Sequence, residues 1–469
     1  MIARFQYLIL AFILALGFAV RLYKIDNPIA DWHSWRQADT SSVTRNFVKH
    51  GIDLLRPRYD NLSYVSDSGI YNPQGYRFVE FPLFNLAHYT LYSLISNFYS
   101  LEFAGRMTSI LASLVSAGLL FTITRRHASV FAALLAAAVY LFLPYNIYFT
   151  RVVLPDPLMV TLLLAALNFS DLYFTTSKFR YLVFSAFFGG LATLVKPTAL
   201  FFLLPAAWQF WQKFKLRVFR HSHFWFFQLA LFLPFFLWRS WSHRFPEGIP
   251  SSLWLLNGNG IRFRPAFFRW IFGERIGKMI LGSWGLLPFS LGLASVGYFA
   301  PWVIAALLYL FTFATGNVQH DYYQIPVIPI VSILVALGAV HFSSTWPKRF
   351  LVAVSLIFMV AFAWYDIKGN YQVNHWEIVH AGAAADRLLP ADAIVIAPYG
   401  FDTALLYQIN RRGFPAVTLP IKDFKDRYGA MYYVSVNFDD QTTAVMTKYT
   451  VLAQTPEYVI VKLDEPIRP

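Results

Sequence analysis

The chain has 469 residues, of which 57% are hydrophobic and only 14% are charged. Soluble domains carry about 25% charged residues, so a soluble globular protein is excluded, and the deficit is typical of helices that face lipid. The net charge of +14 does not indicate a nucleic-acid-binding protein, because the basic residues stand in short clusters between apolar runs, as in cytoplasmic loops. The absence of Cys excludes disulfides, thiolate metal sites and cysteine nucleophiles.

The first predicted element is an apolar helix over residues 7–20, followed by Arg21 and Lys24. No small-residue cleavage pattern follows it, so we interpret this segment as a retained membrane anchor rather than a signal peptide. A long polar loop, residues 22–106, comes next. Within it, the stretch 31–60 is rich in charged and aromatic side chains, and we expect chemistry at the membrane surface to be placed there.

Hydropathy predicts about eleven transmembrane helices, because about 20 apolar residues, with a range of roughly 17–25, cross a bilayer. Residues 82–99 are also apolar, but counting them as a span would place the basic loops outside, so the positive-inside rule predicts a juxtamembrane helix. The predicted topology has the N-terminus inside and the C-terminus outside. The predicted spans are 5–21, 107–124, 128–149, 157–175, 181–196, 198–212, 224–241, 281–299, 301–316, 325–343 and 350–366.

The pattern changes near residue 370. Short apolar runs, AIVIA, YYVSV and YVIVKL, predict strands, and residues 376–389 and 403–413 predict helices, the second with a Gly stop. The predicted fold class is therefore a polytopic α-helical membrane domain over residues 1–366, with an extracytoplasmic α/β domain over residues 367–469. Four polar segments lie at the predicted outer face, namely 22–106, 151–157, 242–278 and 316–324.

Asp39 is the first candidate for chemistry. It precedes Thr40 and a run, Val43 to His50, that is expected to be helical, so one interpretation is a carboxylate at a helix N-terminus. The functional interpretation is a general base for an attacking hydroxyl, with Arg36 placed to hold phosphate.

Two further acids lie in the outer segments. Asp156 stands between Pro155 and Pro157, where it either caps the next helix or acts as a functional carboxylate at the membrane face. Glu80, before the juxtamembrane helix, either favours that helix or adds to the site. Acids from two loops could bind a divalent metal through oxygen ligands, but no spacing demands one. The metal is therefore unknown, with Asp39 and Asp156 as its ligands if one is used.

Cations and aromatic residues complete the candidates. Lys196 ends the run AFFGGLATLV and is either a snorkelling lysine or a cation for a lipid phosphate. Arg262 and Arg264 lie in an outer loop, where they either contact lipid phosphate or are ordinary surface residues. A membrane-interface aromatic belt explains tyrosines such as Tyr322 without any function. The predicted substrate-binding residues are His33, Trp35, His320, Tyr322 and Tyr323.

Several motifs occur in a characteristic order over residues 5–335: HSWRQADTSSVTRNF, PRYD, EFPLFNLAHY, GRMTSILASLVSAGLLFTITRR, YFTRVVLPDPLM, GGLATLVKP and HDYYQIPVIP. In this order the chain resembles the bacterial relatives of the dolichyl-phosphate-mannose protein mannosyltransferases, and it is similar in layout to the lipid A aminoarabinose transferase. The resemblance implies a GT-C fold and a sugar donor linked to polyprenyl phosphate, used outside the cytoplasm in an inverting single displacement.

The resemblance also implies roles for three residues. It places Asp39 as the first-loop acid, Asp156 as the second-loop acid and Lys196 as the lysine after the Gly-Leu run. The family's first loop often carries an Asp-Glu pair, whereas Thr40 follows Asp39 here, which leaves metal dependence and the acceptor open.

The sequence thus predicts a plasma (inner) membrane glycosyltransferase with Asp39 as base, acting on a lipid, glycan or protein acceptor and using no certain cofactor. A transporter or flippase of lipid-linked intermediates is the alternative, and a non-catalytic scaffold is another. A transporter needs polar residues near the membrane midplane. The ionisable residues of this chain stand mostly at the ends of the predicted spans, which favours surface chemistry.

Overall fold

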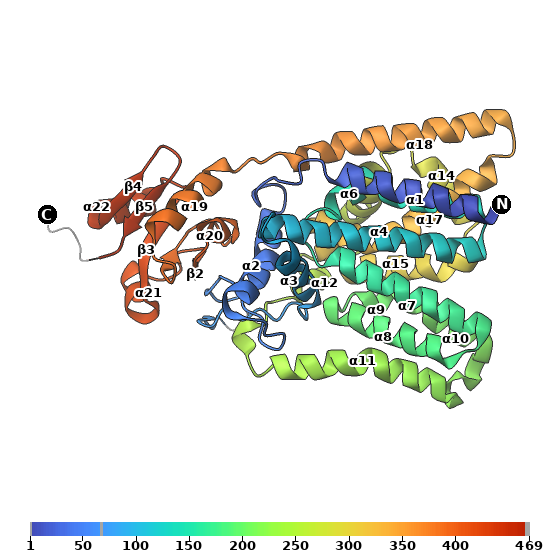
Figure 1. The fold of residues 1–469 in the computed structure, drawn as a ribbon, viewed down its shortest axis with the longest axis horizontal. Helices are drawn as coiled ribbons and strands as arrows, with labels where there is room; N and C mark the ends of the chain where they lie inside the picture. The colour runs from blue at the N-terminus through green and yellow to red at the C-terminus, as the bar shows by residue number, and fades with distance from the viewer. Residues whose placement is uncertain (1, 66–68, 465–469) are drawn as a thin grey trace. The chain divides into compact units, whose positions relative to one another are not determined.

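The computed structural model describes residues 2–65 and 69–464. The chain divides into two compact units, each described here by itself. The helical unit comprises Met1–Ile25, Arg106–Arg239 and Ser252–Gly369, and the mixed unit comprises Asp26–Gly105, Ser240–Ser251 and Asn370–Pro469. Figure 1 labels the helices and strands of both units.

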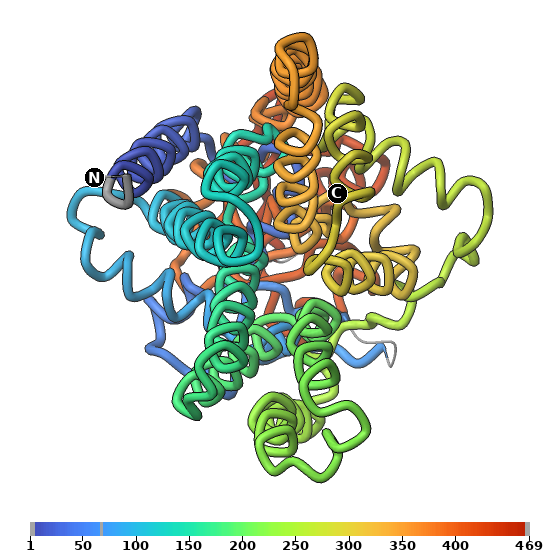
Figure 2. Tube along the Cα trace, turned by 90° about the vertical axis from the view of Figure 1, so that its right-hand side faces the viewer, coloured from blue at the N-terminus to red at the C-terminus, as the bar shows by residue number. Residues whose placement is uncertain are grey.

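The helical unit consists almost wholly of helices, which Figure 2 views close to end-on. The elements are α1 (Ile2–Arg21), most of α4 (Leu101–His127), α5 (Val130–Phe142), α6 (Pro144–Phe149), α7 (Asp156–Thr176), α8 (Phe179–Val195), α9 (Ala199–Phe202), α10 (Leu204–Phe214), η1 (Lys215–Arg220), most of α11 (Ser222–Ser242), α12 (Trp254–Asn257), α13 (Pro265–Phe268), the π-helix η3 (Arg269–Ile280), α14 (Leu286–Ala294), η4 (Gly297–Phe299), α15 (Ala300–Thr312), α16 (Ala314–Gln319), η5 (Asp321–Val327), α17 (Ile328–Phe342) and α18 (Trp346–Ile367).

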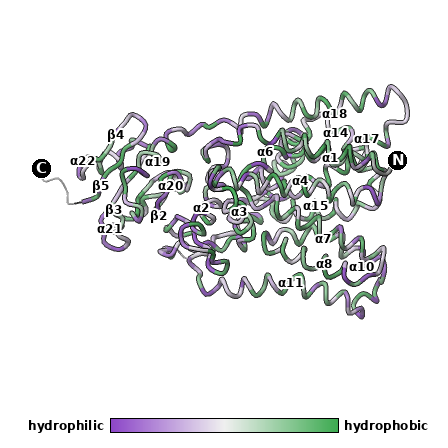
Figure 3. The backbone as a smooth tube through the Cα atoms, in the orientation of Figure 1, coloured by the Kyte–Doolittle hydropathy of each residue, from purple (hydrophilic) through white to green (hydrophobic). Residues whose placement is uncertain are grey.

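Within residues 2–65 and 69–464, four helical segments are long and apolar enough to cross a membrane: Leu101–His127, Asp156–Thr176, Asp321–Phe342 and Trp346–Leu388. A fifth is added if the bent pair Leu286–Ala294 and Gly297–Thr312 is one span, and Phe5–Arg21, Val130–Phe142 and Phe179–Val195 are shorter apolar helices. Figure 3 colours α7 and α8 mainly as hydrophobic. The protein is thus a multi-pass membrane protein, while the total of eleven spans and their sidedness stay predictions.

The predicted span 128–149 is broken in the structure, between α5 and α6. Leu143 is extended because the residue before a proline disfavours the helical conformation, and Pro144 begins α6. The carbonyls that this break frees are satisfied by side chains: Asn146 donates to Tyr140 O at 2.6 Å, and the buried Arg21 donates to Leu141 O at 2.9 Å. Arg21 is therefore a structural residue of the bundle.

The described residues of the mixed unit form a five-stranded sheet in the order β2-β1-β3-β5-β4. β1 is parallel to β2 and β3, whereas β5 is antiparallel to β3 and β4. The three predicted strands correspond to β1, β3 and β5. The elements of this unit are α2 (Ser34–His50), α3 (Leu83–Ile95), η2 (Pro246–Gly248), η6 (Lys368–Tyr371, which begins in the other unit), α19 (Trp376–Leu388), β1 (Ile394–Ile396), α20 (Ala404–Ile409), β2 (Arg412–Phe414), α21 (Ile421–Tyr428), β3 (Ala430–Ser435), α22 (Asp440–Lys448), β4 (Thr450–Gln454) and β5 (Val459–Lys462).

The helix predicted over residues 403–413 ends earlier than the Gly stop suggested. Asn410 takes the left-handed conformation, with φ of 60°, directly after α20. Gly413 lies in β2, where a Cβ would overlap the carbonyl oxygen of Val395 in β1. The glycine is therefore required by close strand pairing and does not terminate the helix.

The segment that follows α2 is joined to the sheet. Leu62 N donates to Gly413 O at 2.8 Å, and Gly413 N donates to Asp60 O at 2.9 Å. Leu62 is also buried in the core cluster on one face of the sheet, and Ala30 is buried in the cluster on the other face. Residues 26–105 and the C-terminal residues thus share one hydrophobic core.

Two helix predictions in the first loop can be compared with the structure. α3 (Leu83–Ile95) confirms a helix within residues 82–99. The helix expected from Val43 begins nine residues earlier, at Ser34. The expected start was wrong because α2 has no side-chain cap: His33 precedes it in a left-handed conformation, with φ of 55°, and nothing in the local pattern marks that start.

Candidate functional site

A buried ion pair connects the start of α7 to the end of α8. Lys196, the residue after α8, donates from Nζ to Oδ1 of Asp156 at 2.8 Å. The Asp156 side chain is 3% exposed and that of Lys196 is 15% exposed. Oδ2 of Asp156 is buried and, among the residues that the structure describes, has no hydrogen-bond partner. The carboxylate therefore keeps an unused acceptor beside a cation.

The sequence left open whether these two residues were merely a cap and a snorkelling lysine. Asp156 is the first residue of α7, whose start has no side-chain cap hydrogen bond, so its carboxylate does not cap the helix. A charge at that position is still favoured by the helix dipole. Lys196 is paired and largely buried, which differs from a lysine whose amine extends into water.

Aromatic rings surround the ammonium group. Lys196 Nζ lies 5.6 Å from the ring centroids of both Tyr322 and Tyr323, within the range of cation–π attraction. The His320 ring is 5.6 Å from that of Tyr322 and 5.3 Å from that of Tyr323. Tyr309 fixes this segment by donating to Tyr323 O at 2.9 Å. The structure thus brings three predicted substrate-binding residues together with Lys196.

A second charged pair, which the sequence did not single out, lies near this cluster. Arg275 NH1 is 4.0 Å from Oδ2 of Asp321, and Arg275 NH2 donates to Val318 O at 2.9 Å. Tyr145 donates to Asp321 O at 2.6 Å, and its hydroxyl is in electrostatic range of Asp321, Arg275 and Asp156. Arg275 was missed because it is one of several basic residues in 262–278, and no spacing distinguishes it from the others.

The two arginines predicted to bind phosphate have other environments. Arg262 NH2 donates to Leu256 O at 2.9 Å and to Thr312 O at 2.7 Å, so it holds backbone carbonyls together. Arg264 precedes the short helix α13 and is exposed. Among the described residues, neither arginine forms an ion pair or hydrogen bond with Asp156 or Lys196.

In the mixed unit, Asp39 lies in the interior of α2 and not at its N-terminus. Both oxygens of its buried carboxylate are bound. Arg77 NH2 is 2.8 Å from Oδ2, and Thr403 Oγ1 donates to Oδ1 at 2.8 Å. The N-terminal interpretation of Asp39 is therefore wrong, and the carboxylate is oriented by one residue of the first loop and one of the C-terminal segment. Neither Arg77 nor Thr403 carries a local signal that would have predicted this contact.

The remaining candidates of this unit lie on or next to α2. Arg36 forms an ion pair with Glu80, and the start of α3 has no side-chain cap hydrogen bond. Trp35 accepts from Thr403 Oγ1 at 3.3 Å through its backbone carbonyl. His33 is the residue before α2 and acts electrostatically on Asp402.

Other buried charges of this unit maintain its fold. Arg45 forms an ion pair with Asp60 and donates to Tyr407 O at 2.9 Å. Its guanidinium also lies 4.0 Å from the centroid of the Tyr407 ring. Asp60, from the PRYD motif, additionally accepts from Asn46 at 3.0 Å. These contacts bind α2 to α20, and we assign them no chemical role.

No group of three or more His, Asp or Glu side chains that could hold a metal ion occurs within residues 2–65 and 69–464. The divalent metal therefore stays a hypothesis, with Asp39 and Asp156 belonging to different units.

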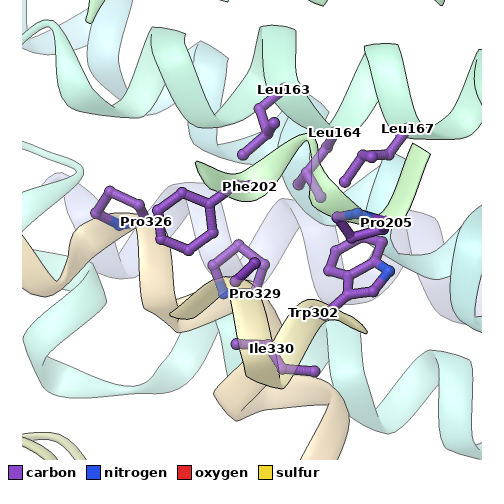
Figure 4. A pocket seen from close by; sticks show the side chains of 10 residues that line it. Leu163, Leu164, Leu167, Phe202, Pro205, Trp302, Pro326, Pro329 and Ile330 are labelled. Carbon is purple, nitrogen blue, oxygen red and sulfur yellow. The ribbon is translucent and has the colours of Figure 1, made fainter. Parts of the chain in front are cut away.

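A narrow apolar pocket with a volume of about 10 Å³ lies within the helical unit. Figure 4 shows leucines of α7 on one side, with Phe202, Trp302 and Pro326 around the pocket. Its lining is Leu163, Leu164, Leu167, Phe202, Pro205, Trp302, Ala305, Pro326, Pro329 and Ile330. Leu163 is two turns along α7 from Asp156, and Pro326 is three residues after Tyr323, so the elements that carry the polar cluster also line this pocket.

Comparison with known proteins gives both a family model and a fold. Residues 85–241 match the model for dolichyl-phosphate-mannose-protein mannosyltransferase, whereas no curated protein matches the chain by sequence. The fold is similar to that of ArnT from Cupriavidus metallidurans in the apo state, with a TM-score of 0.68 at 16% identity over 97% of each chain.

Two more crystal structures are similar. ArnT from Cupriavidus metallidurans bound to undecaprenyl phosphate has a TM-score of 0.66 at 15% identity, covering 97% of this chain and 98% of that one. The Archaeoglobus fulgidus oligosaccharyltransferase in complex with Zn and sulfate has a TM-score of 0.53 at 12% identity, covering 94% of this chain and 71% of that one. The chain has the GT-C fold. The predicted resemblance is confirmed, and the predicted enzyme class, a GT-C-type glycosyltransferase, agrees with these matches.

Proposed function

We propose that the protein transfers a sugar from a polyprenyl-phosphate-linked donor to an acceptor hydroxyl of a lipid, glycan or protein. The observation that carries the proposal is the buried Asp156–Lys196 pair, with its tyrosines, at the start of a helix long enough to span a membrane. The match to a mannosyltransferase family model and the undecaprenyl phosphate in the ArnT crystal support this class of donor.

The chemistry needs a cation where the donor's phosphate is released. The acceptor oxygen forms a bond to the anomeric carbon, and the bond from that carbon to the phosphate oxygen breaks with its electron pair. The released polyprenyl phosphate carries one more negative charge than the phosphodiester, so a positioned cation stabilises the transition state. Lys196 is that cation in this proposal, and Arg275 is a further one.

A base must take the proton of the acceptor hydroxyl, and Asp39 has this role in the proposal. Its contacts with Arg77 and Thr403 fix the orientation of the carboxylate, which a general base needs in order to reach a hydroxyl. Attack from the side opposite the leaving phosphate inverts the anomeric configuration. We also propose that the reaction takes place at the periplasmic or extracellular face of the plasma membrane.

The test is turnover of the purified full chain with a panel of polyprenyl-phosphate sugars. Wild type, Asp39→Asn, Lys196→Met and Lys348→Met are compared, the last as a control because Lys348 is exposed in the helical unit. We expect release of polyprenyl phosphate by wild type and Lys348→Met only. Full transfer by Asp39→Asn would remove it as the base, and movement of intact donor across vesicles without cleavage would favour the transporter.

A further inference from the structure

One end of the helical unit carries basic residues without matching acids. Between Asp171 and Glu247 the sequence contains no Asp or Glu. Six basic residues stand at or next to two connections of that stretch, the turn between α7 and α8 and the connection from α10 to α11, and all six are exposed. None of the six forms an ion pair within the described part of the chain. They are Lys178, Arg180, Lys213, Lys215, Arg217 and Arg220.

Contacts within the helical unit bring the two connections together. Lys213 Nζ donates to Ser177 Oγ at 3.2 Å. The Tyr173 hydroxyl and His223 Nδ1 are hydrogen-bonded at 2.7 Å, and the ring centroids of His223 and Phe179 are 4.8 Å apart. The six basic residues therefore belong to one surface, which we call the basic surface.

Exposed apolar side chains stand among these cations. Leu216 is 75% exposed, Phe219 is 56% exposed and Trp225 is 55% exposed, whereas Val218 of the same short helix is buried. Trp225 Nε1 donates to Phe219 O at 2.9 Å, so the indole is held against η1. Exposed rings next to Lys and Arg are typical of segments at a membrane–water interface, where the rings lie at the level of the headgroups and the cations reach the phosphates.

The basic surface lies at the end of a helix that is long enough to cross a membrane. Helix α7 covers Asp156–Thr176, and Lys178 follows its last residue by two positions. At about 1.5 Å per residue, the 21 residues of α7 extend about 30 Å, which is the thickness of the hydrocarbon core. The basic surface is therefore a full membrane thickness away from Asp156, and a phosphate bound there is not that of a donor at the Asp156–Lys196 pair.

We propose that the basic surface binds the headgroups of anionic phospholipids in the leaflet at this end of α7. The cations attract the negatively charged headgroups, and the side chains of Leu216, Phe219 and Trp225 enter the boundary between headgroups and acyl chains. A soluble polyanion would leave these three side chains in water, so a lipid surface accounts better for the mixture of cations and apolar groups. This inference goes beyond the proposed function, and it needs neither the sugar donor nor the acceptor.

Orientation of the chain during membrane insertion does not by itself account for this surface. Positive charges near the end of a span orient a membrane protein wherever they stand in the loop. Here the side chains of two separate connections are brought together by a hydrogen bond and by ring contacts, with exposed rings among them. Lipid binding by the basic surface is therefore a property of the folded chain, and the purified protein should show it.

The first test measures how lipids stabilise the purified full chain in detergent micelles. The melting temperature is followed as phosphatidylglycerol, phosphatidylcholine or inorganic phosphate is added to wild type and two variants. The η1 variant loses three charges of the basic surface: Lys215→Gln, Arg217→Gln and Arg220→Gln. The control variant loses the same number of positive charges at exposed positions of the mixed unit: Lys422→Gln, Arg427→Gln and Lys448→Gln.

We expect phosphatidylglycerol to raise the melting temperature of wild type and of the control variant equally. The η1 variant should need an at least about tenfold higher concentration for half of the effect, and phosphatidylcholine and inorganic phosphate should stabilise none of the three proteins. An η1 variant that responds like the control overturns the proposal, as does an equal response of wild type to phosphatidylcholine. An equal response to inorganic phosphate would indicate a site for a soluble anion and overturns it too.

A second measurement uses wild type alone, so it decides the question even if the η1 variant does not fold. Attraction between exposed charges is screened by salt, so the stabilisation by phosphatidylglycerol should become smaller as NaCl is raised from about 0.05 M to about 0.5 M. A stabilisation that salt leaves unchanged overturns a charge-based lipid surface. Neither test involves sugar transfer, so the proposal stands or falls independently of the proposed function.

Discussion

Removing Lys196 alone should destabilise the helical unit, while removing both members of its ion pair should not. Asp156 is almost fully buried, and its second oxygen has no hydrogen-bond partner among the described residues. In Lys196→Met the carboxylate would remain in place without its cation. Breaking one partner of a buried pair costs about 3–5 kcal/mol, because an uncompensated charge stays in a region of low dielectric.

The double variant Asp156→Asn with Lys196→Met removes both charges. Replacing a buried ion pair by neutral residues is often neutral, or stabilises by about 1–4 kcal/mol. We therefore expect the free energy of unfolding of the double variant to lie within about 1 kcal/mol of the wild-type value, or to exceed it. The double variant is then at least about 2 kcal/mol more stable than Lys196→Met, although it carries one substitution more.

The assay is thermal unfolding of the detergent-solubilised full chain, followed by the transfer reaction on the same samples. One kcal/mol shifts the melting temperature by roughly 2–4 °C for domains of 150–250 residues, so Lys196→Met should melt several degrees below wild type. Lys348→Met serves as the exposed control. The double variant should recover the melting temperature but not the activity, because the phosphate would still lack its cation.

Two results would refute this reasoning. A wild-type melting temperature in Lys196→Met would mean that the pair contributes nothing to stability. An active double variant would mean that Lys196 has only a structural role, whatever the melting temperatures show.

Three further outcomes are expected. Because the pKa of Asp402 is raised to about 6, the folded state binds a proton between pH 4 and 6 that the unfolded state does not, and wild-type stability falls as the pH rises from 4 to 6. Asp402→Asn should therefore be up to about 3 kcal/mol more stable than wild type at pH 8 and no more stable at pH 4. Thermal melts at a series of pH values test this. Arg77→Gln, which removes the cation beside Asp39, should lower kcat with little change in the donor KM in steady-state kinetics. Gly338→Ala should lower the melting temperature or yield, because its Cβ would overlap Pro288 O between α17 and α14; normal melting would contradict that contact.

Part of the candidate site could be predicted from the sequence, and part of it could not. The spans 157–175 and 181–196 are separated by a short turn, and consecutive apolar helices with a short connection are antiparallel neighbours. The start of the first and the end of the second must then lie at the same end, where Asp156 and Lys196 stand. Asp156 and Lys196 were each predicted as site residues, but their pairing was not. That pairing could have been inferred from the lengths of the two spans and the short turn between them.

The contacts around Asp39 could not be predicted from the sequence in this way. Helix α2 has few apolar residues, yet 12 of its 17 residues are buried, because polar partners from distant segments surround it. Asn85, for example, donates to Thr40 O at 2.7 Å and to Thr44 Oγ1 at 2.9 Å. Hydrophobic periodicity detects helices through an apolar face, so a buried polar helix gives no such signal.

The sheet explains how the C-terminal segment reaches α2. Edge strands expose unpaired backbone groups that other segments can bind, and β2 lies at one edge of this sheet, with β4 at the other. Residues 60–62 pair with Gly413 in β2. Thr403 directly precedes α20, the helix that leads into β2. The same edge contact that holds the first loop on the sheet therefore helps to keep Thr403 in hydrogen-bond contact with Asp39. The acid site of this unit thus depends on the sheet as much as on the loop that carries Asp39.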